Sequence, residues 1–131
     1  MKLAGDWEGY SVNTIADNYG IDASILDLYE VIYGYYKYED YSGASFVLLK
    51  DKKTGDLFEV HGSHCSCYGL EGQWEPESTT LESILFRLKE GRISGLSNES
   101  EIGFLLALSE KKDLTEVVEK STKKKKNTTK L

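Results

Sequence analysis

The pattern of hydrophobic and polar positions changes from helical to extended and back to helical along the chain. Residues 14–27 are expected to form a helix in two pieces, because Asn13 and Asp22 can begin a helix and Gly20 can end one. The stretch 16–25 has the spacing of a helix-turn-helix motif, but its second piece carries acids where a DNA-reading helix would carry Arg or Lys. Specific binding of nucleic acid is therefore not expected.

Three segments rich in β-forming residues follow, at 28–38, 44–50 and 57–60. The segment 51–56 between the last two has the composition of a hairpin turn. Short connections between consecutive strands favour antiparallel pairing. We therefore expect a small three-stranded antiparallel meander, from whose last strand the chain departs as a loop.

Helical spacing returns in the C-terminal half. Thr79–Glu82 matches a capping box, and Gly91 can end the helix that follows. The apolar stripe of this helix repeats at positions i, i+3, i+4 and i+7, namely Leu81, Ile84, Leu85 and Leu88. Another helix is expected over 98–108 and a short one over 113–118. Helices packed on one face of a small antiparallel sheet give an α+β fold.

The charge distribution separates a body from a tail. Five of the 16 basic residues are lysines within 121–131, where there is no acid, which leaves 11 basic against all 22 acidic residues in 1–120. We expect residues 1–120 to form a single α+β domain and residues 121–131 to be a disordered lysine-rich tail. An acidic body disfavours contacts to DNA phosphates and suits a basic partner protein, or simply solubility.

The chain carries no sign of a membrane segment or a secretory signal. No apolar run approaches the roughly 20 residues of a membrane span, and the N-terminus lacks an apolar signal core. We therefore expect a cytoplasmic protein that does not bind membranes, with both cysteines reduced.

Both histidines and both cysteines fall within the seven residues from 61 to 67. A zinc ion could use all four side chains, His61, His64, Cys65 and Cys67, although Cys-x-Cys is tighter than the usual ligand spacing. A thiol-dependent enzyme could instead pair Cys65 or Cys67 with His61 as its base. In the interpretation that we favour, this segment is a sharp loop in which Cys65 and Cys67 are small buried residues and the histidines bond to backbone groups.

Tyrosines and acids form a second group of candidate residues. The chain has nine tyrosines, six of them between positions 29 and 41, and exposed tyrosine beside acids is typical of protein interfaces. Trp74 suits either a surface or a core position, and we favour the core. The candidate binding residues are Tyr38, Glu39, Asp40, Tyr41, Tyr68, Glu71 and Trp74.

Three stretches carry a resemblance to other proteins, namely Tyr38–Gly43, His61–Pro76 and Thr79–Glu82. They resemble a group of small proteins of bacteriophages and prophage-bearing bacteria for which no activity is established. The resemblance covers roughly residues 13–90, and its most specific part is the motif His-Cys-Ser-Cys-Tyr-Gly-x-Glu-Gly-Gln-Trp. It implies a phage-type accessory protein of the host cytoplasm and assigns no catalytic residue.

The sequence therefore predicts a non-enzymatic interaction module that binds a host or phage protein through an acidic, tyrosine-rich surface and the 61–77 loop. The alternative is a small metal- or thiol-dependent enzyme acting on a nucleotide or nucleic acid. The expected cofactor is none, or zinc. Self-association is expected, if at all, through residues 99–118.

Overall fold

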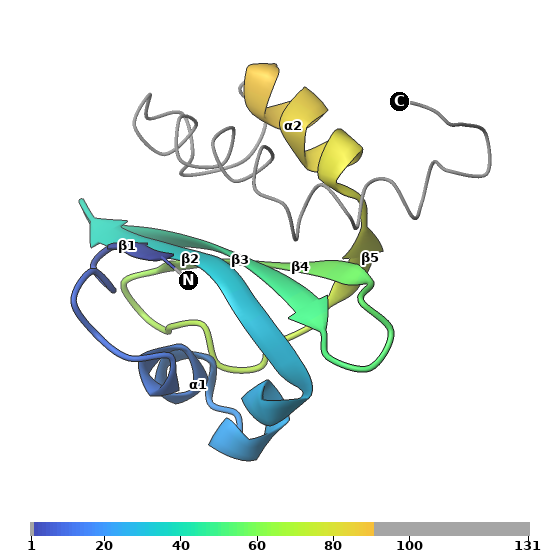
Figure 1. Cartoon of the computed structure of the whole chain (residues 1–131). Coiled ribbons are helices and arrows are strands. Elements are labelled where there is room, and N and C mark those ends of the chain that lie inside the picture. Colours follow the sequence, from blue (N-terminus) through green and yellow to red (C-terminus); the bar gives the residue numbers. More distant parts are fainter. Residues whose placement is uncertain (1, 91–131) are drawn as a thin grey trace. The chain divides into compact units, whose positions relative to one another are not determined.

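The computed structural model describes residues 2–90 (Figure 1). The chain divides into two units between Thr79 and Thr80, and each unit is described by itself. The single domain expected over 1–120 stays a prediction. Several sequence predictions lie outside the described residues: the end of a helix at Gly91, the helices at 98–108 and 113–118, the contact surface at 99–118 and the tail at 121–131.

The first unit is built on one five-stranded sheet with the order β1-β2-β3-β4-β5. β1 pairs with β2 in parallel, and the other neighbours are antiparallel. The strands are β1 (Lys2–Gly5), β2 (Tyr29–Glu39), β3 (Ser42–Asp51), β4 (Leu57–Cys65) and β5 (Glu77–Thr79). The combination of sheet and helices is confirmed, but the three-stranded meander is wrong. The two added strands have four and three residues, too few to show an alternating pattern.

β4 is longer than the sequence suggested. The prediction ended this strand at Val60 and continued it as a loop, whereas β4 runs on through both histidines to Cys65. Gly, His and Ser are weak β formers, so composition concealed the extension. Residues 61–65 are held in the strand by pairing with β3, in which Ser42 lies opposite Cys65 and Gly43 lies opposite His64.

Two short helical elements precede the sheet's central strands, α1 (Asn13–Tyr19) and the 3₁₀ helix η1 (Ala23–Leu28). Gly20 ends α1 in the left-handed conformation, as predicted. The Asp22 carboxylate accepts a hydrogen bond of 2.9 Å from the N–H of Ser24, which confirms Asp22 as a cap. Asn13 is instead the first residue of α1, and the cap position is Val12.

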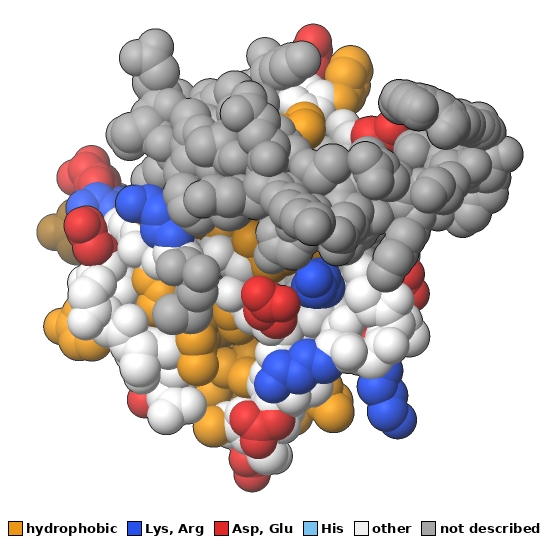
Figure 2. Space-filling model, in the orientation of Figure 1, with side chains coloured by type: hydrophobic (Ala, Val, Ile, Leu, Met, Phe, Trp, Pro, Cys, Tyr) orange, Lys and Arg blue, Asp and Glu red, His pale blue; other side chains and the backbone are white. Residues whose placement is uncertain are grey.

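The core of the first unit lies between one face of the sheet and α1. Figure 1 shows α1 and the segment that joins β4 to β5 on this same side. The largest fully buried members of the core cluster are Trp7, Ile15, Tyr19, Leu49 and Leu70. Burial of such a side chain contributes about 1.5–3 kcal/mol. The outer surface mixes acidic and lysine side chains with apolar ones (Figure 2).

The second unit is described only as far as its first helix, α2 (Leu81–Lys89). The hydroxyl of Thr80 caps it, accepting a hydrogen bond of 3.0 Å from the N–H of Ser83. The capping box was predicted one residue too early, because Thr79 belongs to β5. No helix within residues 2–90 is long and apolar enough to cross a membrane.

Candidate functional site

The His/Cys segment does not form one cluster. Side chains alternate along a strand, so His61 and His64 lie on opposite faces of the sheet. His64 lies on the face that α1 covers, within 5.8 Å of the Tyr36 ring centroid. His61 lies on the other face beside Phe46, with ring centroids 5.2 Å apart. The four side chains predicted to share a zinc ion are therefore not brought together.

His64 uses both of its ring nitrogens within the protein. Its Nδ1 lies 2.7 Å from the carbonyl oxygen of Cys65, so Nδ1 carries a proton and donates it to that oxygen. In the neutral ring Nε2 is then an acceptor, and the Tyr36 hydroxyl donates to it at 2.7 Å. His64 bonds to the backbone, as expected from the sequence. The rest of that interpretation is wrong, because His61 bonds to the Glu59 carboxylate, Cys65 is only half-buried and Cys67 is exposed.

Three tyrosine rings surround this buried imidazole. The ring centroids of Tyr36, Tyr38 and Tyr68 lie 5.8, 5.2 and 6.3 Å from that of His64. The histidine is only 8 % exposed, but Tyr38 is 43 % and Tyr68 is 60 % exposed. A buried side chain thus fixes the positions of two rings that face solvent.

A glycine in the middle strand makes this ring cluster sterically feasible. Tyr38 of β2 lies opposite Gly43 of β3, which in turn lies opposite His64 of β4. A Cβ atom on Gly43 would overlap the Nε2 atom of His64. The missing side chain therefore leaves the space in which the Tyr38 and His64 rings approach each other across β3.

The hairpin that joins β2 to β3 presents a third tyrosine. Its two turn residues, Asp40 and Tyr41, have φ angles of 55° and 65°, which a type I′ turn requires and which a tyrosine rarely adopts. Tyr41 is 79 % exposed. We call Tyr38, Tyr41 and Tyr68, together with the exposed acids Glu39 and Asp40, the tyrosine surface.

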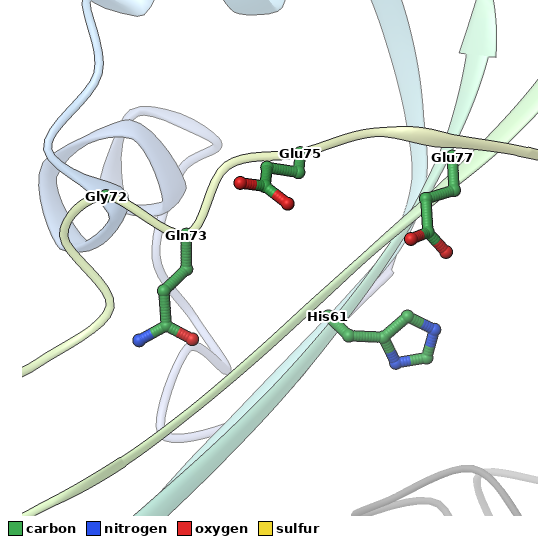
Figure 3. A pocket seen from close by; sticks show the side chains of 5 residues that line it. All are labelled: His61, Gly72, Gln73, Glu75 and Glu77. Atoms are coloured by element: carbon green, nitrogen blue, oxygen red, sulfur yellow. The ribbon is translucent and has the colours of Figure 1, made fainter.

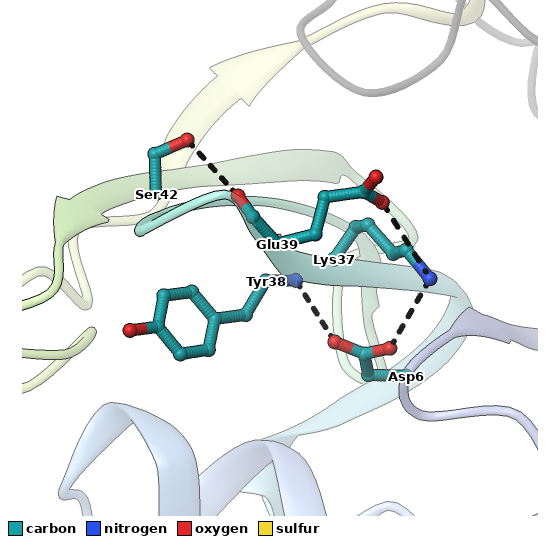
Figure 4. Close-up of polar contacts among 5 residues, drawn as sticks. All are labelled: Asp6, Lys37, Tyr38, Glu39 and Ser42. Atoms are coloured by element: carbon teal, nitrogen blue, oxygen red, sulfur yellow. Dashed lines mark hydrogen bonds and ion pairs between the residues drawn. The ribbon is translucent and has the colours of Figure 1, made fainter.

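Asp6 secures the β2 side of this surface (Figure 4). β1 ends at Gly5, so it does not pair with the end of β2. There the Asp6 carboxylate accepts a 2.8 Å hydrogen bond from the backbone N–H of Tyr38. The same carboxylate lies 3.6 Å from Lys37, whose ammonium is also 3.8 Å from Glu39. Lys37 is thus paired with two acids. Burial, and after it the charge of Asp6, raises the pKa of Tyr36.

Gln73 secures the β4 side in a similar way. Its amide oxygen accepts from the N–H of Ser63 at 2.9 Å, and its amide nitrogen donates to the carbonyl of Ser63 at 2.8 Å. A further bond of 3.0 Å to the carbonyl of Gly69 ties the loop that carries Tyr68 to the strand. Gln73 therefore continues the edge pairing of β4 beyond β5.

Trp74 helps to hold the segment between β4 and β5 against the core. Its ring packs edge-on against Tyr19, with centroids 5.3 Å apart, and contacts the core cluster. Trp74 therefore packs against the core as expected, but it is half-buried and is not a member of the buried core. Glu71 is exposed, and its side chain lies against Gly20 at the end of α1.

A shallow pocket of about 200 Å³ opens at the edge of β4, where the chain before β5 separates from this strand (Figure 3). His61, Glu75 and Glu77 border it, together with Gly72 and Gln73. His61 is held by the buried carboxylate of Glu59, with Nε2 and Oε1 2.5 Å apart. The volume is below the roughly 300–1,000 Å³ that is usual for small-molecule sites.

The structure does not bring His61 next to Cys65, as a catalytic base and its thiol would require. His61 shares a face with Cys65, but four residues of extended strand separate them by about 13 Å. Cys65 and Cys67 are free thiols next to each other. Within residues 2–90, no three His, Cys, Asp or Glu side chains are grouped to hold a metal ion.

No family model matches the chain, and no curated protein or solved structure is similar to it. The resemblance to phage proteins stays a prediction. The residues that sequence reasoning missed are Asp6, Tyr36, Gly43 and Gln73. Only Tyr36 left a signal, because positions 36 and 38 of one strand must share a face.

Proposed function

We propose that this protein is a phage-type accessory protein that acts as a non-enzymatic interaction module and binds a basic region of a host or phage protein. The observation that carries the proposal is the tyrosine surface, with three exposed rings at the end of the sheet where Glu39 and Asp40 are also exposed. Tyrosine is enriched at interfaces because its ring offers a large contact area with few rotatable bonds.

Charge supports a basic partner. Residues 2–79 contain 14 acidic residues and five lysines. At the tyrosine surface, Lys37 is paired with Asp6 and Glu39. Lys50, Lys52 and Lys53 lie at the other end of β3, about 30 Å away along the strand. The tyrosine end of the sheet therefore has a negative field, which attracts a basic partner and disfavours an acidic one.

Preorganisation also supports binding. The bonds from Tyr36 to His64, from Tyr38 to Asp6 and from Gln73 to Ser63 fix the exposed rings before any partner arrives. A surface that is ordered in advance loses less conformational entropy on association.

The proposal can be tested by retention of partners from host extract. Tagged wild-type protein is compared with the triple variant Tyr38→Ser, Tyr41→Ser, Tyr68→Ser, and with Leu28→Ser as a matched control. Leu28 is 62 % exposed and lies beside the opposite end of β2. We expect wild type and control to retain the same basic protein, and the triple variant to bind it at least about 30-fold more weakly.

Retention should also fall as salt concentration rises, because salt screens exposed charges. The proposal fails if the triple variant melts like wild type and still binds the same protein with unchanged affinity.

A further inference from the structure

Two free thiols share one turn at the end of β4. Cys65 is the last residue of the strand, and Cys67 follows in a turn through Ser66. The turn brings the backbone N–H of Cys67 to 3.4 Å from Cys65 Sγ, to which it donates a hydrogen bond. Cys67 is exposed and Cys65 is half-buried, so a small solute can reach the turn.

The two thiols differ in acidity. The pKa of Cys65 is lowered, first because the Cys67 thiol donates a hydrogen bond to it and then because the Cys67 N–H does so. The pKa of Cys67 is raised, first because of that same hydrogen bond to Cys65. Thiolate is the reactive form of cysteine, so Cys65 is the nucleophile and Cys67 is the thiol beside it.

We propose that Cys65 and Cys67 form a redox modification site, at which a peroxide converts the two thiols into an internal disulfide. In the first step Cys65 Sγ attacks a peroxide oxygen; an S–O bond forms, the O–O bond breaks, and hydroxide leaves and takes up a proton as water. In the second step Cys67 Sγ attacks the Cys65 sulfenic acid; the S–S bond forms, the S–O bond breaks and a second water leaves. Hydrogen peroxide gains the two electrons that the thiols lose.

The position of the pair suits a reversible modification. A disulfide across a single intervening residue closes a small, strained ring, and strained, exposed disulfides are readily reduced by thiols. Such a bridge is poorly suited to be a permanent staple of the fold. The site needs no partner protein, so its test is independent of the proposed function.

The test exposes the reduced full-length protein to hydrogen peroxide at neutral pH and follows intact mass and peptide maps. Wild type should lose two hydrogen atoms, gain a Cys65–Cys67 link and return to the reduced mass with dithiothreitol. Cys67→Ser should stop at the sulfenic acid, which dimedone labels at Cys65. Cys65→Ser, the matched control, should be labelled at Cys67 at least about tenfold more slowly, because the Cys67 N–H donates to the side chain at position 65 and not to the Cys67 thiol.

Two results would overturn the proposal. One is equal labelling rates in the two single-cysteine variants. The other is oxidation of wild type to disulfide-linked dimers without the internal link.

Discussion

His64 fixes the positions of the neighbouring tyrosine rings, although it is itself buried. Its Nδ1 donates to its own strand and its Nε2 accepts from Tyr36, so the ring has one orientation. Tyr38 and Tyr68 pack against that fixed ring. His64, one of the four candidate zinc ligands in the sequence, thus has a positioning role in the structure.

Tyr41 is held in a conformation that is unfavourable for its side chain. A left-handed φ angle costs a non-glycine residue about 1–2 kcal/mol. We expect Tyr41→Gly to raise the free energy of unfolding by about 0.5–1 kcal/mol in urea titrations, while it weakens partner binding. A loss of stability in this variant would show that the exposed ring makes a stabilising contact in the free protein.

Tyr19 predicts a pH dependence of stability. Burial raises its pKa from the ordinary 10.0 to about 12, against the opposing hydrogen bond to Ser45. Because the folded state keeps this proton longer than the unfolded state, the contribution is fully present below pH 10 and is lost as the pH rises towards 12. The loss amounts to about 3 kcal/mol.

Urea unfolding between pH 9 and pH 11 checks this prediction against Tyr19→Phe, which has no proton to lose. We expect a steeper fall of stability in wild type than in the variant. Parallel pH profiles would mean that the Tyr19 hydroxyl ionises as easily in the folded protein as in the unfolded chain.

At the scale of elements, the strands that are rich in β-forming residues could be predicted from the sequence. The segments 28–38 and 44–50 became β2 and β3 with small shifts, and the hairpin turn before β4 formed as expected. β1 and β5 are too short to have a pattern of their own and depend on pairing with a neighbour. Local composition cannot reveal that kind of stabilisation.

Most site contacts were not predicted because the second half of β4, residues 61–65, was expected to be a loop. Once residues 61–65 are a strand, alternation alone separates His61 from His64 and places His64 beside Tyr36 and Tyr38. The loop interpretation hid this consequence. The supporting bonds of Asp6 and Gln73 join residues far apart in the chain, so no local pattern predicts them.

Gly43 gives a test of the strand register at the site. Gly43→Ala should push the His64 ring away and break its bond with Tyr36, at a cost of about 1–3 kcal/mol in urea unfolding. In a His64→Ala background the same change should cost less than about 0.5 kcal/mol, because the obstructing ring is gone. An equal cost in both backgrounds would mean that the strain lies elsewhere in β3.

At the scale of the described first unit, the exposed tyrosines lie at one end of the sheet, together with Glu39 and Asp40. The opposite end carries Lys50, Lys52 and Lys53 together with Glu30 and Asp51, and Lys50 lies 3.8 Å from Glu30. The acidic pocket at His61 lies apart from the exposed rings, whereas the thiol pair lies beside them, because Cys65 is opposite Ser42 and Cys67 directly precedes Tyr68. A binding role for the tyrosine end is therefore separable by mutation from the pocket.

The most direct test of the interaction surface places a photo-crosslinking amino acid, p-benzoylphenylalanine, at position 41 and, in a matched variant, at position 28. Both positions are exposed, one at each end of β2. After irradiation in host cells, we expect a crosslink to one basic protein from position 41 and none from position 28, with loss of that crosslink in Tyr38→Ser, Tyr68→Ser protein. A crosslink from position 28 alone, or equal crosslinking from both positions, would contradict the account.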